Sequence, residues 1–391
     1  MKLPSISRYL DKYESFMCDL LAESVVPHGD LIQRWGELDE NLLFKVAERN
    51  LATSVIGHFL DRLSSQIKVS QRWRIAHDKT DYRIRSYLEE LDRIAAKLAR
   101  ENIPLVALKN GGIARGIYPC PGCCPMGDLD VLVKRKDFRE AHEVLLQQGY
   151  KFQFRSILEK PDFEAAMRNG GAEYWKALQG GEKLWLELQW RPIAGRWIRP
   201  DQEPSADDLI NRSVSIPGTA VRLLSPEDNL LQVSLHTVKH SYIRAPGFRL
   251  HLDVERIVRY QTIDWEVFLQ RVVSLEVKTS VYFSLLIPHL FFDTPIPDFV
   301  LACLGPSQWK AFLVMHWLKG AGFFNPDERK FGRLSYVIFK ILLYDDVKGL
   351  IRAIIPEASW MKKNYELKSS ALLPFFYLAR LGNLAFRRLR T

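Results

Sequence analysis

Apolar residues recur every three or four positions through roughly the first hundred residues, which is the spacing that one face of an α-helix requires. This pattern predicts helices over residues 8–22, 42–63 and 82–102. The third is the most regular, and its apolar side carries Leu88, Leu91, Ile94, Ala95 and Leu98. Pro104 follows and marks its end, because proline disfavours helical geometry in the residue before it. We expect these helices to pack as a layer on the rest of the chain.

The middle of the chain changes to the two-residue alternation that is typical of β-strands. Strands are predicted over residues 105–108, 129–133, 150–154 and 183–190, with an amphipathic helix over 136–148. In the last strand the apolar face is formed by Leu184, Leu186, Leu188 and Trp190, and the other by Trp185, Glu187 and Gln189. Residues 156–183 are polar and are expected to wrap the surface. Residues 191–224 are expected to form a proline-rich connection with little regular structure.

Helical periodicity returns at Ser225-Pro226-Glu227-Asp228, where serine at the cap, proline at the first position and an acid at the third predict a helix start. Helices are predicted over about 226–241, 248–261, 264–292, 306–320, 330–354 and 369–390. The chain has 391 residues and is 47% hydrophobic, which is ample for a large core. The fold class expected is α+β, with a small mixed sheet over 103–200 between helical regions at 1–102 and 201–391.

Two apolar runs in the middle region enclose a glycine pair and two closely spaced acids. Asp128 and Asp130 stand two residues apart, so their side chains would project from one face of a strand. Adjacent carboxylates repel unless a cation lies between them, and Mg²⁺ accepts such ligands together with substrate phosphates. Gly111 and Gly112 carry no Cβ, so their backbone N–H groups could approach a phosphate. The alternative is that the two aspartates are ordinary acids of a turn and a strand edge.

This order of motifs resembles the DNA polymerase β-like nucleotidyltransferase superfamily, in which a hydrophobic residue and two small residues precede a loop and an Asp-x-Asp strand. More closely, the chain is similar to an uncharacterised bacterial nucleotidyltransferase family found near polysaccharide and peptide-modification genes. The corresponding segments here are Leu108-Lys109-Asn110, Gly127-Asp128-Leu129-Asp130-Val131-Leu132-Val133 and Glu187-Leu188-Gln189-Trp190.

The resemblance implies a polymerase β-like core that moves a nucleoside monophosphate from a nucleoside triphosphate, ATP first, to an unidentified hydroxyl-type acceptor. Sugar, small molecule, peptide and protein acceptors all stay open. Two-metal catalysis with Mg²⁺ is implied, with Asp128, Asp130 and Glu187 as catalytic residues and metal ligands. The residues implied in phosphate binding are Lys109, Gly111, Gly112, Lys239 and His240.

Three positions depart from the family pattern. Cys124 stands where the family usually has arginine, Glu187 replaces an aspartate, and Asn110 replaces a glycine. Asparagine tolerates a positive φ, so the turn at 110 can survive. These departures motivate an alternative, a catalytically weak nucleotide-binding scaffold in a biosynthetic complex.

His236 and His240 lie four residues apart on a predicted helix, with Lys239 alongside. The family has a similar His-x-x-Lys-His, followed by arginine and aspartate at positions like Arg249 and Asp253. The resemblance implies that Lys239 binds triphosphate and that Asp253 orients a histidine. The alternative is a histidine pair that joins two helices by hydrogen bonds.

The formal net charge of +9 suits an anionic partner but does not choose one. Nucleic acid is not expected, because no helix-turn-helix, finger or RNP-type motif is present.

The arginine-rich helix 372–390 could contact an anionic membrane peripherally, or pack on the core. Cys120, Cys123 and Cys124 form a Cys-x-x-Cys-Cys pattern, for which zinc binding is one alternative. No second cysteine or histidine pair lies at finger spacing, so a buried loop with free thiols is expected. With no signal peptide and no spanning segment predicted, a cytoplasmic location is expected.

Overall fold

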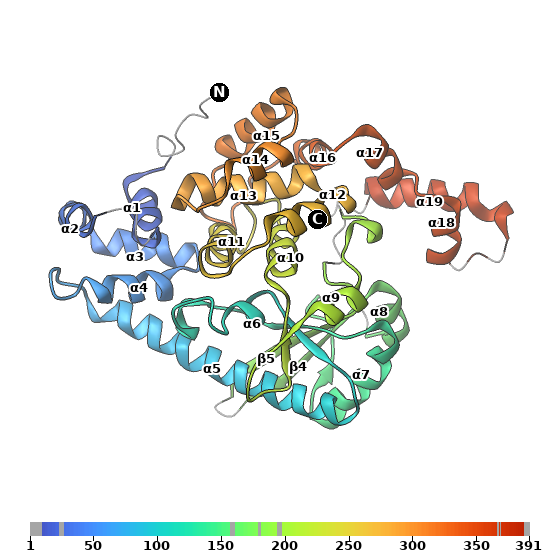
Figure 1. Cartoon of the computed structure of the whole chain (residues 1–391), viewed down its shortest axis with the longest axis horizontal. Helices are drawn as coiled ribbons and strands as arrows, with labels where there is room; N and C mark the ends of the chain where they lie inside the picture. The colour runs from blue at the N-terminus through green and yellow to red at the C-terminus, as the bar shows by residue number, and fades with distance from the viewer. Residues whose placement is uncertain are drawn as a thin grey trace.

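The computed structural model describes residues 10–22, 27–156, 161–178, 181–193, 198–365, 367 and 369–386. These residues form a mixed seven-stranded sheet in the order β3-β4-β5-β2-β1-β7-β6, enclosed by helices from both ends of the chain (Figure 1). The strands are β1 (Leu105–Leu108), β2 (Leu129–Leu132), β3 (Lys151–Phe152), β4 (Gly171–Ala177), β5 (Lys183–Gln189), β6 (Val214–Ser215) and β7 (Val221–Leu223). The predicted α+β class is confirmed.

The middle of the sheet combines two kinds of strand pairing. β2 runs antiparallel to β1 and parallel to β5, and β1 runs parallel to β7 on its other side. The short helices between strands are α6 (Lys109–Ile113), α7 (Phe138–Gln147), α8 (Phe163–Asn169) and α9 (Ala206–Arg212). The predicted strands at 105–108, 129–133, 150–154 and 183–190 and the helix at 136–148 are confirmed, with ends that differ by a few residues.

Residues 156–183 were expected to wrap the surface, and residues 191–224 were expected to have little regular structure. Both stretches contribute strands to the sheet, so these predictions were wrong. Residues 156–183 contain α8 and β4, and β4 pairs along its full length with β5. The alternation of β4 is weak in the sequence because its buried side carries the small Ala172 beside Tyr174. Residues 191–224 contain α9, β6 and β7, and the two strands are too short to show a period.

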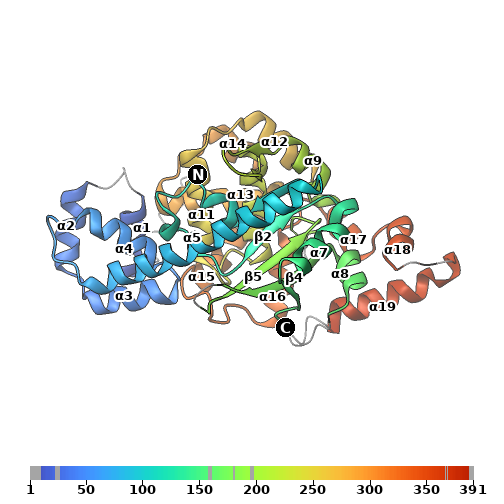
Figure 2. The same ribbon diagram turned by 90° about the horizontal axis from the view of Figure 1, so that it is seen from below.

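The N-terminal helices are α1 (Lys12–Leu21), α2 (His28–Gly36), α3 (Glu40–Arg49), α4 (Thr53–Arg62) and the long α5 (Gln71–Arg100). The predicted helix 42–63 divides into α3 and α4, because Leu51 adopts a φ of +54° between them. The helix predicted from residue 82 begins eleven residues earlier, at Gln71. Figure 2 shows α5 running from the N-terminal helices across the sheet, so it joins these two parts of the molecule.

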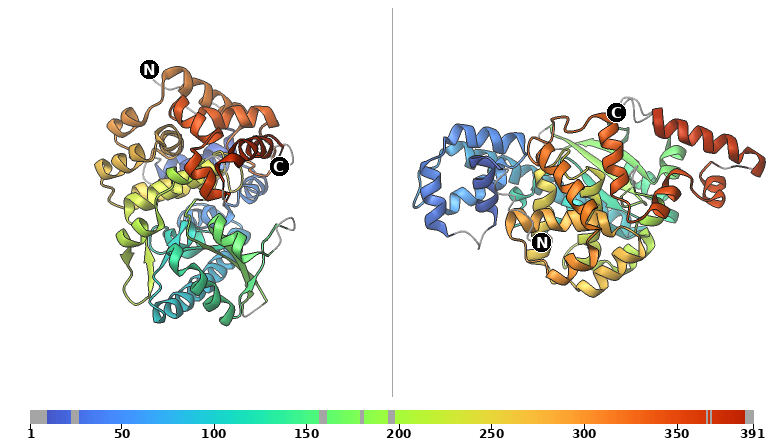
Figure 3. Two further views of the ribbon diagram at one scale, coloured as in Figure 1. Left: turned by 90° about the vertical axis from the view of Figure 1, so that its right-hand side faces the viewer. Right: turned by 90° about the horizontal axis from the view of Figure 1, so that it is seen from above.

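Most of the C-terminal helices lie over the opposite side of the sheet from α5, and the last two, drawn in red, extend to one side of it (Figure 1 and Figure 3). The C-terminal helices are α10 (Pro226–Lys239), α11 (Phe248–Tyr260), α12 (Trp265–Ser274), α13 (Lys278–Phe292), α14 (Asp298–Leu304), α15 (Gln308–Ala321), α16 (Arg333–Leu342), α17 (Val347–Ile354), α18 (Ala358–Asn364) and α19 (Leu373–Phe386). The predicted start of α10 is confirmed, because the Ser225 hydroxyl accepts from the Asp228 N–H. The predicted helix 264–292 divides at Glu276, whose φ is +55°.

The two faces of the central strands bury different side chains. On one face Leu129, Val131, Leu186 and Leu188 join the main core under α5 and α7. On the other face Val106, Leu108 and Leu132 form a smaller apolar cluster with α9. The same alternation that sends the leucines of β2 and β5 into the main core turns the acidic residues of these strands toward the second face.

Within the described residues, no helix is both long and apolar enough to cross a membrane. The peripheral membrane contact predicted for the last helix stays a prediction. Phe375 and Leu378 of α19 are exposed, and the Arg380 guanidinium donates to the Ala353 carbonyl. Arg387, Arg388 and Arg390, on which the prediction depends, lie outside the described residues.

Candidate functional site

Acidic side chains cross the middle of the sheet on its second face. Asp130 of β2 is the register partner of Glu187 in the parallel strand β5, and Glu187 is also the partner of Glu173 in the antiparallel strand β4. Register partners on adjacent strands project from the same face. We call Asp130, Glu187 and Glu173 the acidic row. Asp128 lies just before β2, two residues from Asp130, at one end of this strand.

Lys109 supplies a cation within this group of acids. Its Nζ lies 2.5 Å from Asp130 Oδ1, and the Gln189 amide donates to the same oxygen at 2.8 Å. The Lys109 and Asp130 side chains are only 10% and 6% exposed, so this ion pair is largely removed from water. The structure thus brings together three of the residues that the sequence singled out, Lys109, Asp130 and Glu187.

The pKa shifts of this buried pair report on the crowding of negative charge. Burial alone would lower the pKa of Lys109, but the charges of Asp130, Glu187 and Asp128 outweigh it and raise that pKa. Burial raises the pKa of Asp130, Glu187 raises it further, and Lys109 opposes both. Several carboxylates therefore crowd around the Lys109 amine, and crowded carboxylates are the electrostatic setting that a divalent cation relieves.

Arg155 contacts the acids from the segment that follows β3. Its Nη2 lies 2.5 Å from Asp128 Oδ2, its Nε lies 3.4 Å from Glu173 Oε2, and its guanidinium lies over the Trp185 ring at 5.6 Å. Its backbone N–H also donates to Glu173 at 2.6 Å. The Arg155 side chain is 40% exposed, so the guanidinium lies at the open edge of the acidic row.

The glycine pair lies against the central strands. A Cβ on Gly112 would lie 3.1 Å from the Ala107 carbonyl oxygen, which is tighter than nine in ten real Cβ contacts, so a larger residue there would require the backbone of β1 to shift. The left-handed conformation in this turn falls on Lys109, whose φ is +50°, so the tolerance of Asn110 for a positive φ is not needed. Asn110 can therefore replace the family glycine without taking up a strained backbone.

Asp253 was predicted to orient a histidine, and the structure corrects this prediction. Its carboxylate accepts from the Tyr118 hydroxyl at 2.6 Å and from the Asn110 amide at 3.2 Å. The same Asn110 amide lies 3.3 Å from the Cys124 Sγ. Asp253 of α11 thus holds the turn that carries Lys109, and the local sequence could not reveal this because the partners are about 140 residues apart.

Lys239 and His240 end α10 near the acidic row. Burial, and then the charge of Lys109, lower the pKa of Lys239, whereas Glu187 and Asp130 raise it. The His236 and His240 rings meet edge to face, with centroids 4.7 Å apart. Burial, and then the charge of Lys239, lower the pKa of His240 to about 3, so this imidazole is neutral at neutral pH. It can offer a hydrogen bond there, but no positive charge.

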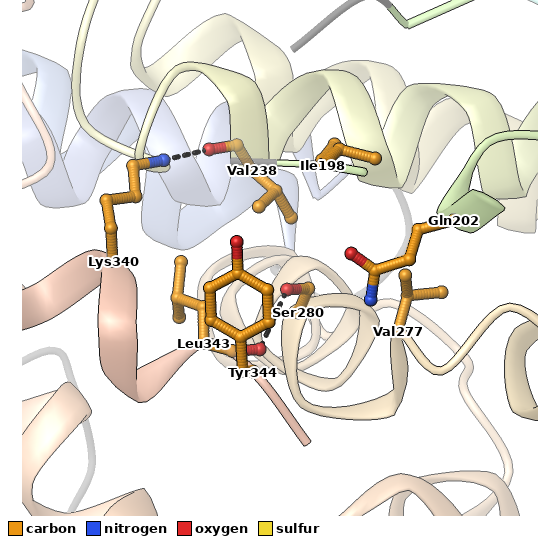
Figure 4. A pocket seen from close by; sticks show the side chains of 8 residues that line it. All are labelled: Ile198, Gln202, Val238, Val277, Ser280, Lys340, Leu343 and Tyr344. Atoms are coloured by element: carbon orange, nitrogen blue, oxygen red, sulfur yellow. Dashed lines mark hydrogen bonds between the residues drawn. The ribbon is translucent and has the colours of Figure 1, made fainter. Parts of the chain in front are cut away.

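A small pocket lies behind the end of α10, between α10, α13 and α16 (Figure 4). It is lined by Ile198, Gln202, Val238, Val277, Ser280, Lys340, Leu343 and Tyr344, none of which carries a carboxylate. Figure 4 shows the Lys340 amine donating to the Val238 carbonyl, one residue before Lys239. This pocket is therefore a different place from the acidic row.

Lys340 gives a pH-dependent prediction. Burial, and then the charge of Arg244, lower its pKa from 10.5 to about 7. Between these values the unfolded chain holds a proton that the folded chain has released, so raising the pH favours the folded protein. Compared with Lys340→Met, the wild-type free energy of unfolding should rise with pH by up to about 1.4 kcal/mol per unit. Chemical denaturation from pH 7 to 10 measures this difference, and parallel curves for the two proteins would contradict it.

Several residues around the site were not predicted from the sequence. Arg155 and Glu173 were missed because they belong to segments for which no strand or contact was expected. The alternation of Glu173 with the buried Ala172 and Tyr174 was the one available signal. The cysteine loop also has unexpected neighbours, because His77 Nε2 lies 3.2 Å from Cys120 Sγ and His58 Nδ1 lies 3.8 Å from it.

Comparison with known proteins gives one result. A family model described as "Uncharacterised nucleotidyltransferase" matches residues 36–293, which is well over half of the chain. No curated protein and no solved structure matches the chain significantly. The matched range contains the glycine pair, the acidic row, Arg155 and the Lys239-His240 pair. The chain belongs to this nucleotidyltransferase family.

Proposed function

We propose that the protein transfers a nucleoside monophosphate from a nucleoside triphosphate, ATP first, to a hydroxyl-type acceptor, with release of pyrophosphate. The observation that carries this proposal is the register of β2 and β5, which sets Asp130 and Glu187 side by side with Asp128 next to them. Three acids in this arrangement are what a metal-assisted phosphoryl-group reaction needs.

The donor set fits Mg²⁺, which prefers carboxylate oxygens and shares its shell with phosphates. The buried Lys109 amine among the acids supports this fit, because the site already requires a positive charge. Asp128, Asp130 and Glu187 would hold two Mg²⁺ ions, and ions in such sites activate an attacking hydroxyl and neutralise the leaving pyrophosphate.

Several positively charged and polar groups surround the acids and would bind the triphosphate. Lys109, Lys239 and Arg155 supply positive charge, and His240 supplies a neutral hydrogen-bonding ring. The backbone at Gly111 and Gly112 would lie against phosphate oxygens. Arg155 would take over the role that arginine at position 124 has in the family, because its guanidinium lies at the exposed edge of the acidic row.

The reaction is tested by pyrophosphate release from ATP, GTP, CTP and UTP with Mg²⁺ and a panel of sugar, peptide and protein acceptors. Turnover that needs both Mg²⁺ and an acceptor supports the proposal, and transfer of labelled nucleotide identifies the acceptor. Tight nucleotide binding without pyrophosphate release across the panel would contradict it and favour the alternative, a nucleotide-binding scaffold.

Arg155 provides a prediction for nucleotide binding. Replacing it with alanine should weaken Mg²⁺–ATP binding by about tenfold to a hundredfold, because a hydrogen bond between charged groups is worth about 1.5–3 kcal/mol. Isothermal titration measures the Kd. Arg139→Ala is the matched control, since Arg139 is also exposed, also pairs with a glutamate, Glu164, and also lies over an aromatic ring. Equal affinities of the two variants for Mg²⁺–ATP would show that Arg155 does not contribute to nucleotide binding.

A further inference from the structure

Two histidines and two cysteines meet at a point where three parts of the chain join. His58 comes from α4, His77 from α5, and Cys120 and Cys123 from the turn η2 (Pro121–Cys123) and its cap. One donor atom from each side chain can be chosen so that all four lie within 4.8 Å of one another. His77 Nε2 lies 3.2 Å from Cys120 Sγ, His58 Nδ1 lies 3.8 Å from it, and the two sulfur atoms are 3.0 Å apart.

The backbone around this cluster is fixed by contacts of its own. The Gly122 N–H donates to Asp81 Oδ1 of α5 at 3.0 Å. A Cβ on Gly122 would lie 2.8 Å from His77 Nε2 and 2.9 Å from the Asp81 Cβ, so glycine is what lets the turn approach the helix. Pro121 occupies the first position of the turn, where its fixed φ is compatible with helical geometry. The loop is therefore docked on α5 with both cysteines facing the histidines.

The donor types select the ion. Two thiols and two imidazoles form the Cys₂His₂ set of closed, structural zinc sites, in which Zn–S is about 2.3 Å and Zn–N about 2.0 Å. A tetrahedral ion with these bond lengths separates its ligand atoms by roughly 3.3–3.8 Å. In such a site two sulfur atoms lie about 3.8 Å apart, and a sulfur and a nitrogen about 3.5 Å apart. The observed S–S distance of 3.0 Å and S–N distances of 3.2 and 3.8 Å are within about 0.8 Å of these values. The Nδ1 of His77 also contacts Asp78 Oδ1 at 3.3 Å, as metal-bound histidines commonly do through their other nitrogen.

We propose that His58, His77, Cys120 and Cys123 bind one Zn²⁺ ion, which ties α4 and α5 to the loop between the glycine pair and Asp128. Residues at both ends of this loop are connected by hydrogen bonds to the carboxylate of Asp253. Tyr118, two residues before Cys120, donates to Asp253, and Cys124, directly after Cys123, contacts Asn110, which donates to Asp253. Because Asn110 follows Lys109, the ion would fix the position of the turn that carries the Lys109 amine.

Zinc content of the purified chain tests this site directly. The full-length protein, isolated without chelator under reducing conditions, should contain about one zinc per chain by mass-spectrometric metal analysis. Cys123→Ser and His77→Asn should each lower this content by at least about tenfold, since a closed site loses its ion when a ligand is removed. Cys303→Ser and His316→Asn replace exposed residues outside the cluster and should keep the full content.

A second measurement does not depend on whether the variants fold. Wild-type protein from which metal has been removed should bind Co²⁺ with the visible absorption of a tetrahedral ion and a thiolate charge-transfer band, and Zn²⁺ should abolish both. Chelation should also lower the Tm of the wild type, and added Zn²⁺ should restore it.

Three results would overturn the zinc site: a zinc-free wild type, equal zinc in wild type and Cys123→Ser, or a Cys120–Cys123 disulfide in protein isolated anaerobically. The outcome is independent of nucleotidyl transfer. A zinc-loaded protein without transferase activity would leave this site in place while contradicting the proposed function, and an active protein without zinc would do the reverse.

Discussion

Replacing Asp130 with asparagine should lower the rate of nucleotidyl transfer by at least about a thousandfold, because it removes a buried negative charge where metal and triphosphate would meet. The substitution nearly preserves the size of the side chain, and Gln189 and Lys109 can still donate to the remaining oxygen. The fold should therefore survive, and circular dichroism and Tm would verify this. Steady-state pyrophosphate release at saturating ATP and Mg²⁺ gives the rate.

Asp137→Asn is the matched control for this variant. Asp137 lies just beyond β2, at the start of α7, where its side chain forms no cap hydrogen bond. Its replacement should leave the rate of nucleotidyl transfer within about twofold of the wild-type rate, as is usual for surface substitutions. Full activity of Asp130→Asn would show that the acidic row is not the reactive centre, even if the protein proves to be a transferase.

Replacing Lys109 with methionine should lower the free energy of unfolding by about 3–5 kcal/mol in the presence of a chelator. The reason is that the Asp130 carboxylate, which is only 6% exposed, would lose its ion-pair partner while it still lies beside Glu187. Adding Mg²⁺ should restore part of the loss, because the ion would take the place of the missing cation. Chemical denaturation with and without Mg²⁺ measures both effects.

The double variant Lys109→Met with Asp130→Asn separates the ion pair from simple packing. If the charge of Asp130 causes the instability, Lys109→Met should lower the free energy of unfolding far less in the Asp130→Asn protein than in the wild type. Lys134→Met is the control, because Lys134 is more exposed and lies 3.7 Å from Asp207. This substitution should lower the free energy of unfolding by less than about 1 kcal/mol. If Lys109→Met lowers the free energy of unfolding equally with aspartate and with asparagine at position 130, Lys109 stabilises the protein through packing alone.

The parts of the site that the sequence predicted are those set by local geometry. Asp128 and Asp130 share a face because they are two residues apart, and the alternation around Glu187 turns it away from the leucines of its own strand. That Glu187 meets Asp130 was implied by the family resemblance, and the register of β2 and β5 confirms it. The roles of these residues in catalysis and in metal and phosphate binding stay predictions.

The parts that were missed depend on contacts between distant segments. Arg155 reaches Asp128 from a segment 27 residues later, and Asp253 reaches Asn110 from 143 residues later, so no local period could reveal either pair. The histidines beside Cys120 stand 43 and 62 residues before it, on helices whose own patterns give no reason to single them out. The short strand β7 was missed because three residues carry no period, although it pairs with the buried β1.

The position of β2 and β5 inside the sheet bears on how such a protein can diversify. Both strands are hydrogen bonded to neighbours on each side, so the spacing of Asp130 and Glu187 is set by the backbone ladder and not by loops. Insertions at the edges of the sheet, or amino-acid substitutions in the surrounding helices, would leave the spacing of these two carboxylates unchanged. One reactive framework could thus be retained while evolution remodels the outer elements for new acceptors.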